Sequence, residues 1–346
     1  MNSSRIISVK LLRALLVPCF FFTNGALLHA KEQPPTTNLT YMGSMPGARQ
    51  MAMGYAFCAV ADDPSAVYYN PAGLAFITKN YLSTSFEAVR QSALTTDEIF
   101  QAEMLRNRNL IFLALVSPKG ALSWRPLADS VWTDARGGNW AKNEFKVNMY
   151  TLSAGHKHSD TFYSGLNLSY IGGQIAQARI VNGIPDTNLA DGSGFTTDLG
   201  LLFVPAERLH IGINMQNLFG MVWWDDFDNE QLPFILKTGF SFQLAQLFTF
   251  TTEWEKRYFR KAGSEDTDIV HFGLEQNLGK ILQVRAGAYG NNLNDNETAH
   301  FTAGFGYKQK GFAISLAGER YRLNGTDVAK YLFSLDIPME TSEKTN

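Results

Sequence analysis

The chain has 346 residues, of which 45% are hydrophobic and 18% charged, with 30 basic and 32 acidic residues and two cysteines. The formal net charge of −2 argues against nucleic-acid binding, which depends on basic stripes, so we expect no nucleic-acid partner. The length allows one large domain or two ordinary ones.

The first thirty residues have the layout of a secretory signal peptide. Three basic residues open the segment: Arg5, Lys10 and Arg13. The apolar block ALLVPCFFF follows at 14–22, and the segment ends on the small residue Ala30. The block is shorter than the roughly 20 apolar residues that a membrane-spanning helix needs. Cys19 allows a lipoprotein alternative, but it lies inside the apolar block, so we favour cleavage after residue 30.

The mature chain after cleavage would be more acidic and would contain a single cysteine. Removing the three basic residues of the leader from 30 leaves 27 against 32 acidic residues, a net charge of −5. Only Cys58 remains, so no intrachain disulfide can form and an exported protein of this kind must be stabilised in another way.

From Tyr81 onward, apolar residues alternate with small or polar ones. In LFTFTTEWEKRY, Phe248 and Phe250 fall on one side of a strand while Thr249 and Thr251 fall on the other. We count fourteen such runs, near 80–90, 108–117, 120–132, 143–157, 161–180, 194–204, 208–219, 232–244, 246–259, 267–277, 281–290, 298–308, 310–322 and 328–338. The pattern predicts an all-β protein with an even number of antiparallel strands.

The connections between the runs alternate between short turns and long loops rich in Asp, Asn and Gly, such as VNGIPDTNLADGSG and WWDDFDNEQLP. Outer-membrane barrels show this asymmetry between their two ends. A soluble β-sandwich is the rival. The runs exceed the usual five or six residues of soluble strands, however, and rings such as Trp223 and Trp224 gather near their ends, where they are expected to lie at the membrane–water boundaries. We therefore predict a transmembrane antiparallel β-barrel over 80–338, a tail at 339–346, and outer-membrane lipid around the exterior.

Residues 31–79 precede the barrel and have neither helical nor strand periodicity. Asp62-Asp63-Pro64 and Asn70-Pro71 interrupt the segment too early for a lipid-facing strand. Asn70 is suited to an Asx-turn because its short side chain can bond nearby backbone. The segment is predicted to form a compact plug inside the lumen, where polar backbone is tolerated at membrane depth.

The stretch GARQMAMGYAFCAVADDPSAVYYNPAGLA, residues 47–75, resembles the start of the FadL-type outer-membrane transporters. In that group an N-terminal hatch with an Asn-Pro-Ala segment plugs a fourteen-stranded barrel. The residues that carry the resemblance are Gly47, Arg49, Gly54, Asp62, Asp63, Asn70, Pro71, Ala72 and Gly73. Two features depart from the group: Tyr55 stands where a second small residue is expected, and no aromatic residue ends the chain.

The resemblance implies a bacterial outer-membrane protein that the barrel-assembly machinery inserts. It also implies passive uptake of hydrophobic small molecules, such as long-chain fatty acids or similar lipids, past the hatch and sideways through the wall. The same pattern is similar to PorV/PorQ-like proteins. An alternative is therefore a barrel that docks secreted or envelope proteins, and a general porin is a third reading.

Four methionines, Met42, Met45, Met51 and Met53, lie within twelve residues of this segment. Packing against the barrel wall is the favoured interpretation. A pliable apolar lining for lipid-like ligands is the functional one, because methionine adapts to irregular shapes. The candidate ligand-binding residues are Met51, Met53, Phe57, Tyr68 and Tyr69. Gly172-Gly173 is the candidate kink at which the wall opens, with a plain bulge as the equal alternative.

The sequence offers little sign of catalysis. Asp62 and Asp63 stand before a proline and are better explained as the start of a turn than as a paired acid and base. His156 and His158, with Asp160 nearby, lack further metal ligands. The stretch GLEQNLGK resembles a phosphate loop but has the wrong spacing, and no Gly-x-Ser-x-Gly elbow appears. We expect no enzyme activity, no metal and no cofactor.

Overall fold

The computed structural model describes residues 44–91, 109–136, 139–181, 183–244, 247–259, 265–295, 297–323 and 325–339. The chain divides into two units, Met1–Lys31 and Glu32–Asn346, and the described residues all belong to the second. The predicted leader at 1–30, the start of the predicted 31–79 segment and the tail after Met339 lie outside the described residues.

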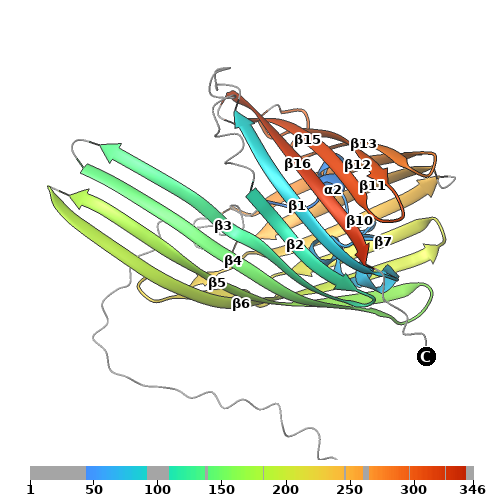
Figure 1. Cartoon of the computed structure of the whole chain (residues 1–346), viewed down its shortest axis with the longest axis horizontal. Coiled ribbons are helices and arrows are strands. Elements are labelled where there is room, and N and C mark those ends of the chain that lie inside the picture. The colour runs from blue at the N-terminus through green and yellow to red at the C-terminus, as the bar shows by residue number, and fades with distance from the viewer. Residues whose placement is uncertain are drawn as a thin grey trace, which may run out of the picture. The chain divides into compact units, whose positions relative to one another are not determined.

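Fourteen antiparallel strands close into a barrel, which confirms the predicted fold class and strand number. Each strand pairs with the next, and β1 pairs with β16 from Asn80↔Met339 onward, which closes the ring (Figure 1). The strands are β1 (Asn80–Gln91), β2 (Asn109–Ser117), β3 (Gly120–Arg136), β4 (Asn139–Lys157), β5 (Phe162–Val181), β6 (Ile184–Ala206), β7 (Leu209–Gln216), β10 (Phe234–Leu244), β11 (Phe248–Tyr258), β12 (Thr267–Leu278), β13 (Leu282–Gly290), β14 (His300–Lys308), β15 (Ala313–Leu323) and β16 (Thr326–Met339).

The two faces of the strands follow the alternation in the sequence. In β11 the outward Phe250 and Trp254 are 36% and 37% exposed, whereas the inward Thr251 and Glu253 are each 1% exposed. Burying small and polar groups inside and leaving large apolar groups outside is the arrangement of a barrel surrounded by hydrocarbon. No helix among the described residues has the length and apolar character to cross a membrane.

The wall is much taller on one side, which corrects one sequence expectation. The stretch 184–193, predicted as part of a loop, belongs to β6 and pairs with β5 as far as Val181↔Ile184. Figure 1 shows β3, β4, β5 and β6 running side by side as the longest ribbons. The Asp, Asn and Gly residues of this stretch are typical of a loop. In the structure, however, β5 pairs with the stretch and satisfies its backbone hydrogen-bonding groups.

The predicted loop after β7 also contains structure. Two short strands, β8 (Met221–Trp224) and β9 (Glu230–Gln231), pair with each other, and β8 pairs with β6. Trp224 is only 2% exposed, so its predicted place at a membrane boundary is wrong, whereas Trp223 is 42% exposed. Trp224 belongs to an apolar cluster between this loop and the tall strands, which also contains Leu127, Ala128, Phe145, Val147, Met149, Ile171, Ile175, Ala190, Val222, Phe227 and Leu232.

Residues 44–79, the inner segment, contain three short helices and pack against the inward faces of the strands. The helices are α2 (Ala48–Ala52), α3 (Ala66–Tyr69) and the 3-10 helix η2 (Pro71–Phe76). Helix α2 contacts β13, β14, β15 and β16, while η2 contacts β4, β5 and β6. The segment therefore touches opposite stretches of the wall, and most of its side chains are completely buried.

Candidate functional site: an inner segment between two polar chambers

Glycines on the inward faces of the strands let the inner segment approach the wall. A Cβ added at Gly165 would lie 2.1 Å from the carbonyl carbon of Pro71, and one at Gly287 would lie 2.2 Å from the amide nitrogen of Gly54. Seven of these glycines are opposite one another across strand pairs: Gly155↔Gly165, Gly165↔Gly200, Gly212↔Gly239 and Gly273↔Gly287. Only residues without a side chain fit these contacts.

Wall side chains bind the backbone of the inner segment, mostly through its carbonyl groups. Asn214 and Gln216 donate to the carbonyls of Tyr69 and Tyr68, each at 2.8 Å. The Glu253 carboxylate accepts the amide hydrogens of Phe57 at 3.0 Å and Cys58 at 2.7 Å. Similar bonds come from Asn167 to Val67, Thr251 to Ala56, His271 to Gly54, Thr302 to Ala52 and from the Ala48 amide to Ser334. Backbone groups away from water are thus satisfied.

Asn70 of the predicted motif binds both the inner segment and the wall. Its Oδ1 accepts the amide hydrogen of Ala72 at 3.1 Å, which is the Asx-turn that the sequence predicts, and Pro71 opens η2. Its Nδ2 donates to the carbonyl of Cys58 at 2.9 Å and to that of Leu201 in β6 at 3.0 Å. Gly73 lies against Ala61, because a Cβ there would be 1.9 Å from the Ala61 carbonyl oxygen.

Gly47 and Gly54, the two other glycines of the motif, and the adjacent Tyr55 have positive φ angles. Gly47 caps α2 with φ of 95° and Gly54 has φ of 59°, a left-handed region that glycine adopts without cost. Tyr55 also has a positive φ, of 61°, although it is not glycine. Its ring meets Tyr289 edge-on at 5.4 Å between centroids, so the departure from the family pattern places an aromatic contact with β13 at this strained position.

Arg49, Asp62 and Asp63 form one ion-pair network with the wall. The Arg49 guanidinium donates two hydrogen bonds to Glu275 of β12, at 2.8 and 2.9 Å, and also pairs with Asp62 and Asp63. Arg285 of β13 binds the same Glu275 at 2.6 Å. Asp63 additionally accepts the amide hydrogen of Ser65 at 2.9 Å, so the predicted turn and an ion pair coexist there.

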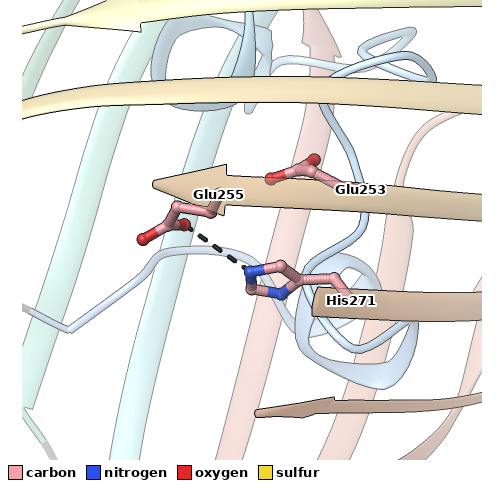
Figure 2. A group of neighbouring side chains, drawn as sticks. All are labelled: Glu253, Glu255 and His271. Atoms are coloured by element: carbon pink, nitrogen blue, oxygen red, sulfur yellow. Dashed lines mark ion pairs between the residues drawn. The ribbon is translucent and has the colours of Figure 1, made fainter. Parts of the chain in front are cut away.

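A second charged cluster lies on β10, β11 and β12. Figure 2 shows Glu253, Glu255 and His271 pointing toward one another, with ligand-type atoms all within 4.8 Å. The Lys237 ammonium already lies among these groups, 2.7 Å from Glu255 and 3.4 Å from Glu253, and Arg257 pairs with the other Glu255 oxygen. A metal ion would have to displace this ammonium, so the cluster is better described as a buried ion-pair network than as an open metal site.

A lower chamber of about 490 Å³ lies on the side of the inner segment that faces the short turns. These turns cover residues 118–119, 158–161, 207–208, 279–281 and 309–312. The chamber is lined by Arg49, Asp62, Asp63 and Glu275, by the turn residues Gly279 and Lys280, and by further polar groups on β1, β10, β13 and β16. It therefore suits water and polar solutes.

An upper chamber of about 370 Å³ lies on the other side, toward the long loops. Its charged lining residues are Arg125, Asp198, Lys237, Glu255, Arg257 and Lys330. Its apolar lining residues include Met45, Val67, Phe112, Met149, Ile235 and Ile269. Among the described residues no ion pair includes Arg125, whose guanidinium lies 5.0 Å from the centre of the Tyr68 ring.

The wall beside the upper chamber is thinly paired. Within the part of the chain that the structure describes, the ladder between β2 and β3 has five residue pairs, from Ser117↔Gly120 to Leu113↔Trp124, whereas β3 and β4 remain paired up to Arg136↔Asn139. Pro126, two residues beyond the last pair, has no amide hydrogen to donate. The upper chamber is lined by Phe112 and Arg125, which lie on the two strands where they part.

The predicted ligand-binding residues divide between two environments. Met51, Met53, Phe57 and Tyr69 are completely buried in one apolar cluster and line neither chamber, which fits the packing interpretation. Tyr68 lines the upper chamber. Ligand contact by the four buried residues stays a prediction.

The two remaining candidates are located as follows. Gly172 and Gly173 lie inside β5, which is paired with β4 and β6 without a register shift at either residue. The register shifts of the wall lie at Ser85/Phe86, Pro126/Ala128 and Phe203/Ala206. His156 and His158 are exposed where β4 ends, with ring centroids 4.6 Å apart, as expected of a strand end.

Sequence reasoning missed Arg125, the charged cluster around Glu253 and the inward glycines. The glycines carry a readable signal, because many of the predicted runs contain one glycine at an inward-facing position, as in YSGLN, DLGLL and HIGIN. Lys237 and Glu255 are 18 residues apart and meet only because β10 and β11 place them directly opposite. Arg125 stands out only once the ion pairs around the chamber are known.

No protein-family model and no curated protein match this sequence. Solved structures do match in fold. The Ralstonia pickettii toluene transporter TbuX is 14% identical with a TM-score of 0.60, covering 86% of this chain and 99% of its own. The monoaromatic hydrocarbon channel CymD is 13% identical with a TM-score of 0.62, covering 89% and 100%.

A Pseudomonas aeruginosa FadL homologue is 13% identical with a TM-score of 0.56, covering 90% of this chain and 100% of its own. The fold similarity therefore extends over nearly the whole length of each structure. It confirms the resemblance to FadL-type barrels at the level of the fold.

Proposed function

We propose that this barrel mediates passive uptake of hydrophobic small molecules across a bacterial outer membrane, and that its substrates carry one anionic head, as long-chain fatty acids do. The fold supports uptake of hydrophobic molecules, because structures of similar fold are described as a toluene transporter and a monoaromatic hydrocarbon channel. The observation that carries the finer proposal is Arg125 in the upper chamber, which forms no salt bridge with any of the described residues.

The upper chamber combines the two chemistries that such a substrate needs. The other cations of its lining have acidic partners: Lys237 and Arg257 pair with Glu255, and Lys330 lies 3.0 Å from Glu87. Arg125 shares the chamber with the Asp198 carboxylate but forms no salt bridge with any described residue, so it is the cation most available to a ligand carboxylate, for which guanidinium geometry is well suited. Met45, Met149 and Ile235 provide apolar surface in the same chamber for the chain of the ligand.

The route out of this chamber is proposed to run between β2 and β3. Five pairs of described residues hold these strands together, and beyond Trp124 the described ladder of β3 is with β4. An apolar molecule that leaves sideways enters the bilayer without crossing water, which is favourable because apolar surface is costly to hydrate. The inner segment would then act as the hatch that closes the axial path below the chamber.

Uptake of labelled oleate and labelled toluene by cells or vesicles that contain the barrel tests the substrate class. A charge-assisted hydrogen bond contributes about 1.5–3 kcal/mol, so Arg125→Met is expected to lower oleate uptake roughly ten- to hundredfold at limiting concentration. Toluene uptake should change little. Arg320→Met is the matched control, because Arg320 pairs with Asp327 and lines neither chamber. An equal loss of both substrates would contradict the anionic-head proposal.

The sideways route has its own test. Pro126→Val restores an amide hydrogen to β3 and lets the ladder with β2 extend, so we expect slower oleate uptake with an unchanged barrel. Pro185→Val, near the start of β6, is the control. Faster or unchanged uptake in Pro126→Val would argue that substrates leave elsewhere, and Gly172-Gly173 would then be the next position to examine.

A further inference from the structure

The two polar chambers meet at a single side chain. Among the described residues that line them, only Phe112 of β2 belongs to both. Phe112 is 2% exposed, so its ring is enclosed where the upper and lower chambers come closest. The barrier between the chambers at this position is therefore one aromatic ring and the residues packed on it.

A bulge in the wall sets the environment of this ring. In the ladder between β1 and β2, Ser85 is opposite Phe112 while Phe86 is opposite Leu110, so Ile111 is an extra residue. Ile111 and Phe112 are consecutive, yet both are buried, at 3% and 2% exposed. A bulge redirects a side chain in this way, and bulges are frequent next to functional sites.

On the side of the inner segment, Phe112 packs in an apolar cluster with Ala66 and Val67. Val67 lines the upper chamber, whereas Ser65, two residues earlier, lines the lower chamber. Ser85, opposite Phe112 on the wall, also lines the lower chamber. The ring thus forms an apolar barrier with polar lining above and below it.

We propose that Phe112 is an aromatic gate between the two chambers, and that its displacement connects them into an aqueous path for small hydrophilic solutes along the barrel axis. This is a second permeation function, separate from the uptake of hydrophobic molecules, which leave through the wall. An apolar constriction between wet compartments blocks ions by excluding water, so a single ring is sufficient as a barrier. The charged linings on both sides make the connected path suitable for ions and small polar solutes.

Steady conductance of the purified barrel in planar bilayers with potassium chloride tests the gate. The wild type is expected to conduct little. Phe112→Ala should raise the steady conductance several-fold, and Phe112→Trp should leave it at the wild-type level because a large ring is retained. Phe145→Ala is the matched control, since Phe145 is also buried but belongs to the apolar cluster near β8 and lines neither chamber.

A second variant covers the case in which Phe112→Ala does not fold. Phe112→Cys should conduct, and a charged methanethiosulfonate reagent should then change its conductance, while the buried Cys58 stays unmodified. Swelling of liposomes in arabinose gives an independent reading of the same path for a neutral solute. Uptake of hydrophobic molecules has no part in either measurement.

Three results would contradict the proposal that Phe112 is a gate. The first is a high steady conductance in the wild type, which would mean that Phe112 does not close the path. The second is a wild-type conductance in folded Phe112→Ala and Phe112→Cys, because the barrier would then lie in the inner segment as a whole. The third is an equal rise in Phe145→Ala, which would indicate general loosening of the barrel.

Discussion

The Asn70 side chain joins the inner segment to the wall at Leu201: its Nδ2 donates to the Leu201 carbonyl oxygen at 3.0 Å. The same side chain accepts the Ala72 amide hydrogen and donates to the Cys58 carbonyl, so one residue links its own turn, the turn at Cys58 in the inner segment, and β6. The Asn-Pro-Ala motif is thus an attachment point as well as a turn.

Asn70→Ala is expected to loosen the inner segment without opening the barrel. The substitution leaves the buried carbonyls of Cys58 and Leu201 without a donor, at a cost of about 1–3 kcal/mol. Cys58 reports the effect, because it is completely buried and burial raises the pKa of its thiol, so alkylation requires the segment to move. We expect alkylation of Cys58 in the folded barrel to become roughly ten- to hundredfold faster.

Asn292→Ala is the control for this experiment. Asn292 also accepts a nearby amide hydrogen, from Asn294, but it does so in an exposed loop, so only the turn is lost. An unchanged alkylation rate in Asn70→Ala would show that the other wall contacts are sufficient to hold the segment.

Gly165→Ala should displace the inner segment by steric conflict. The added Cβ would lie 2.1 Å from the Pro71 carbonyl carbon and 2.3 Å from the Ala72 nitrogen, which are backbone atoms with little freedom to move. Overpacking of this kind costs about 1–3 kcal/mol. The barrel should still form, as judged by its mobility on unheated gels, while amide exchange in residues 66–76 becomes faster. Gly318→Ala is the control, since its nearest neighbour would be 3.6 Å away. Equal amide exchange rates in both variants would contradict the idea that the inward glycines make room for the inner segment.

The strands could be predicted from sequence because outward and inward residues differ in type along the whole wall, as in β11. The connection between β5 and β6 is harder to predict from sequence. Asn182-Gly183 is a strong hairpin signal, but the Pro, Asp and Asn residues that follow it also suggest a loop, and local pattern cannot show that β5 supplies a partner for them. Trp224 was misplaced for a related reason, because the fold of its loop over the tall strands depends on contacts distant in sequence.

The chambers and charged networks could not be predicted, because they depend on register. Arg49 and Glu275 are 226 residues apart, and nothing local indicates that they pair. The Asn-Pro-Ala turn was predictable because its bonds are local. Its anchoring to Leu201 was not, since it depends on how the inner segment is seated in the barrel.

Lys237→Met is expected to destabilise the barrel strongly. The ammonium balances Glu253 and Glu255, which are 1% and 0% exposed, so its loss leaves buried negative charge. Removing one partner of a buried ion pair costs about 3–5 kcal/mol, which should appear as a lower temperature of heat-induced unfolding. Lys256→Met is the matched control on the neighbouring strand, because its partner Asp268 is about half exposed and such pairs contribute about 0–1 kcal/mol. Similar shifts in both variants would argue that the Lys237 network is weak.

Lys237→Ala should also create a divalent-metal site that the wild type lacks. The His271 Nδ1 lies 2.8 Å from the Gly54 carbonyl oxygen and must donate to it, so Nε2, which lies 3.6 Å from Glu255, is the ring nitrogen left to bind a metal. An imidazole held by a backbone carbonyl, together with two carboxylates, is a ligand set that suits Zn²⁺. We expect Zn²⁺ to raise the unfolding temperature of Lys237→Ala and to leave that of the wild type unchanged, because the ammonium occupies the site there. The double variant Lys237→Ala, His271→Gln should not respond. A response in the double variant would place the metal elsewhere, and stabilisation of the wild type by Zn²⁺ would show that the ammonium does not exclude the ion.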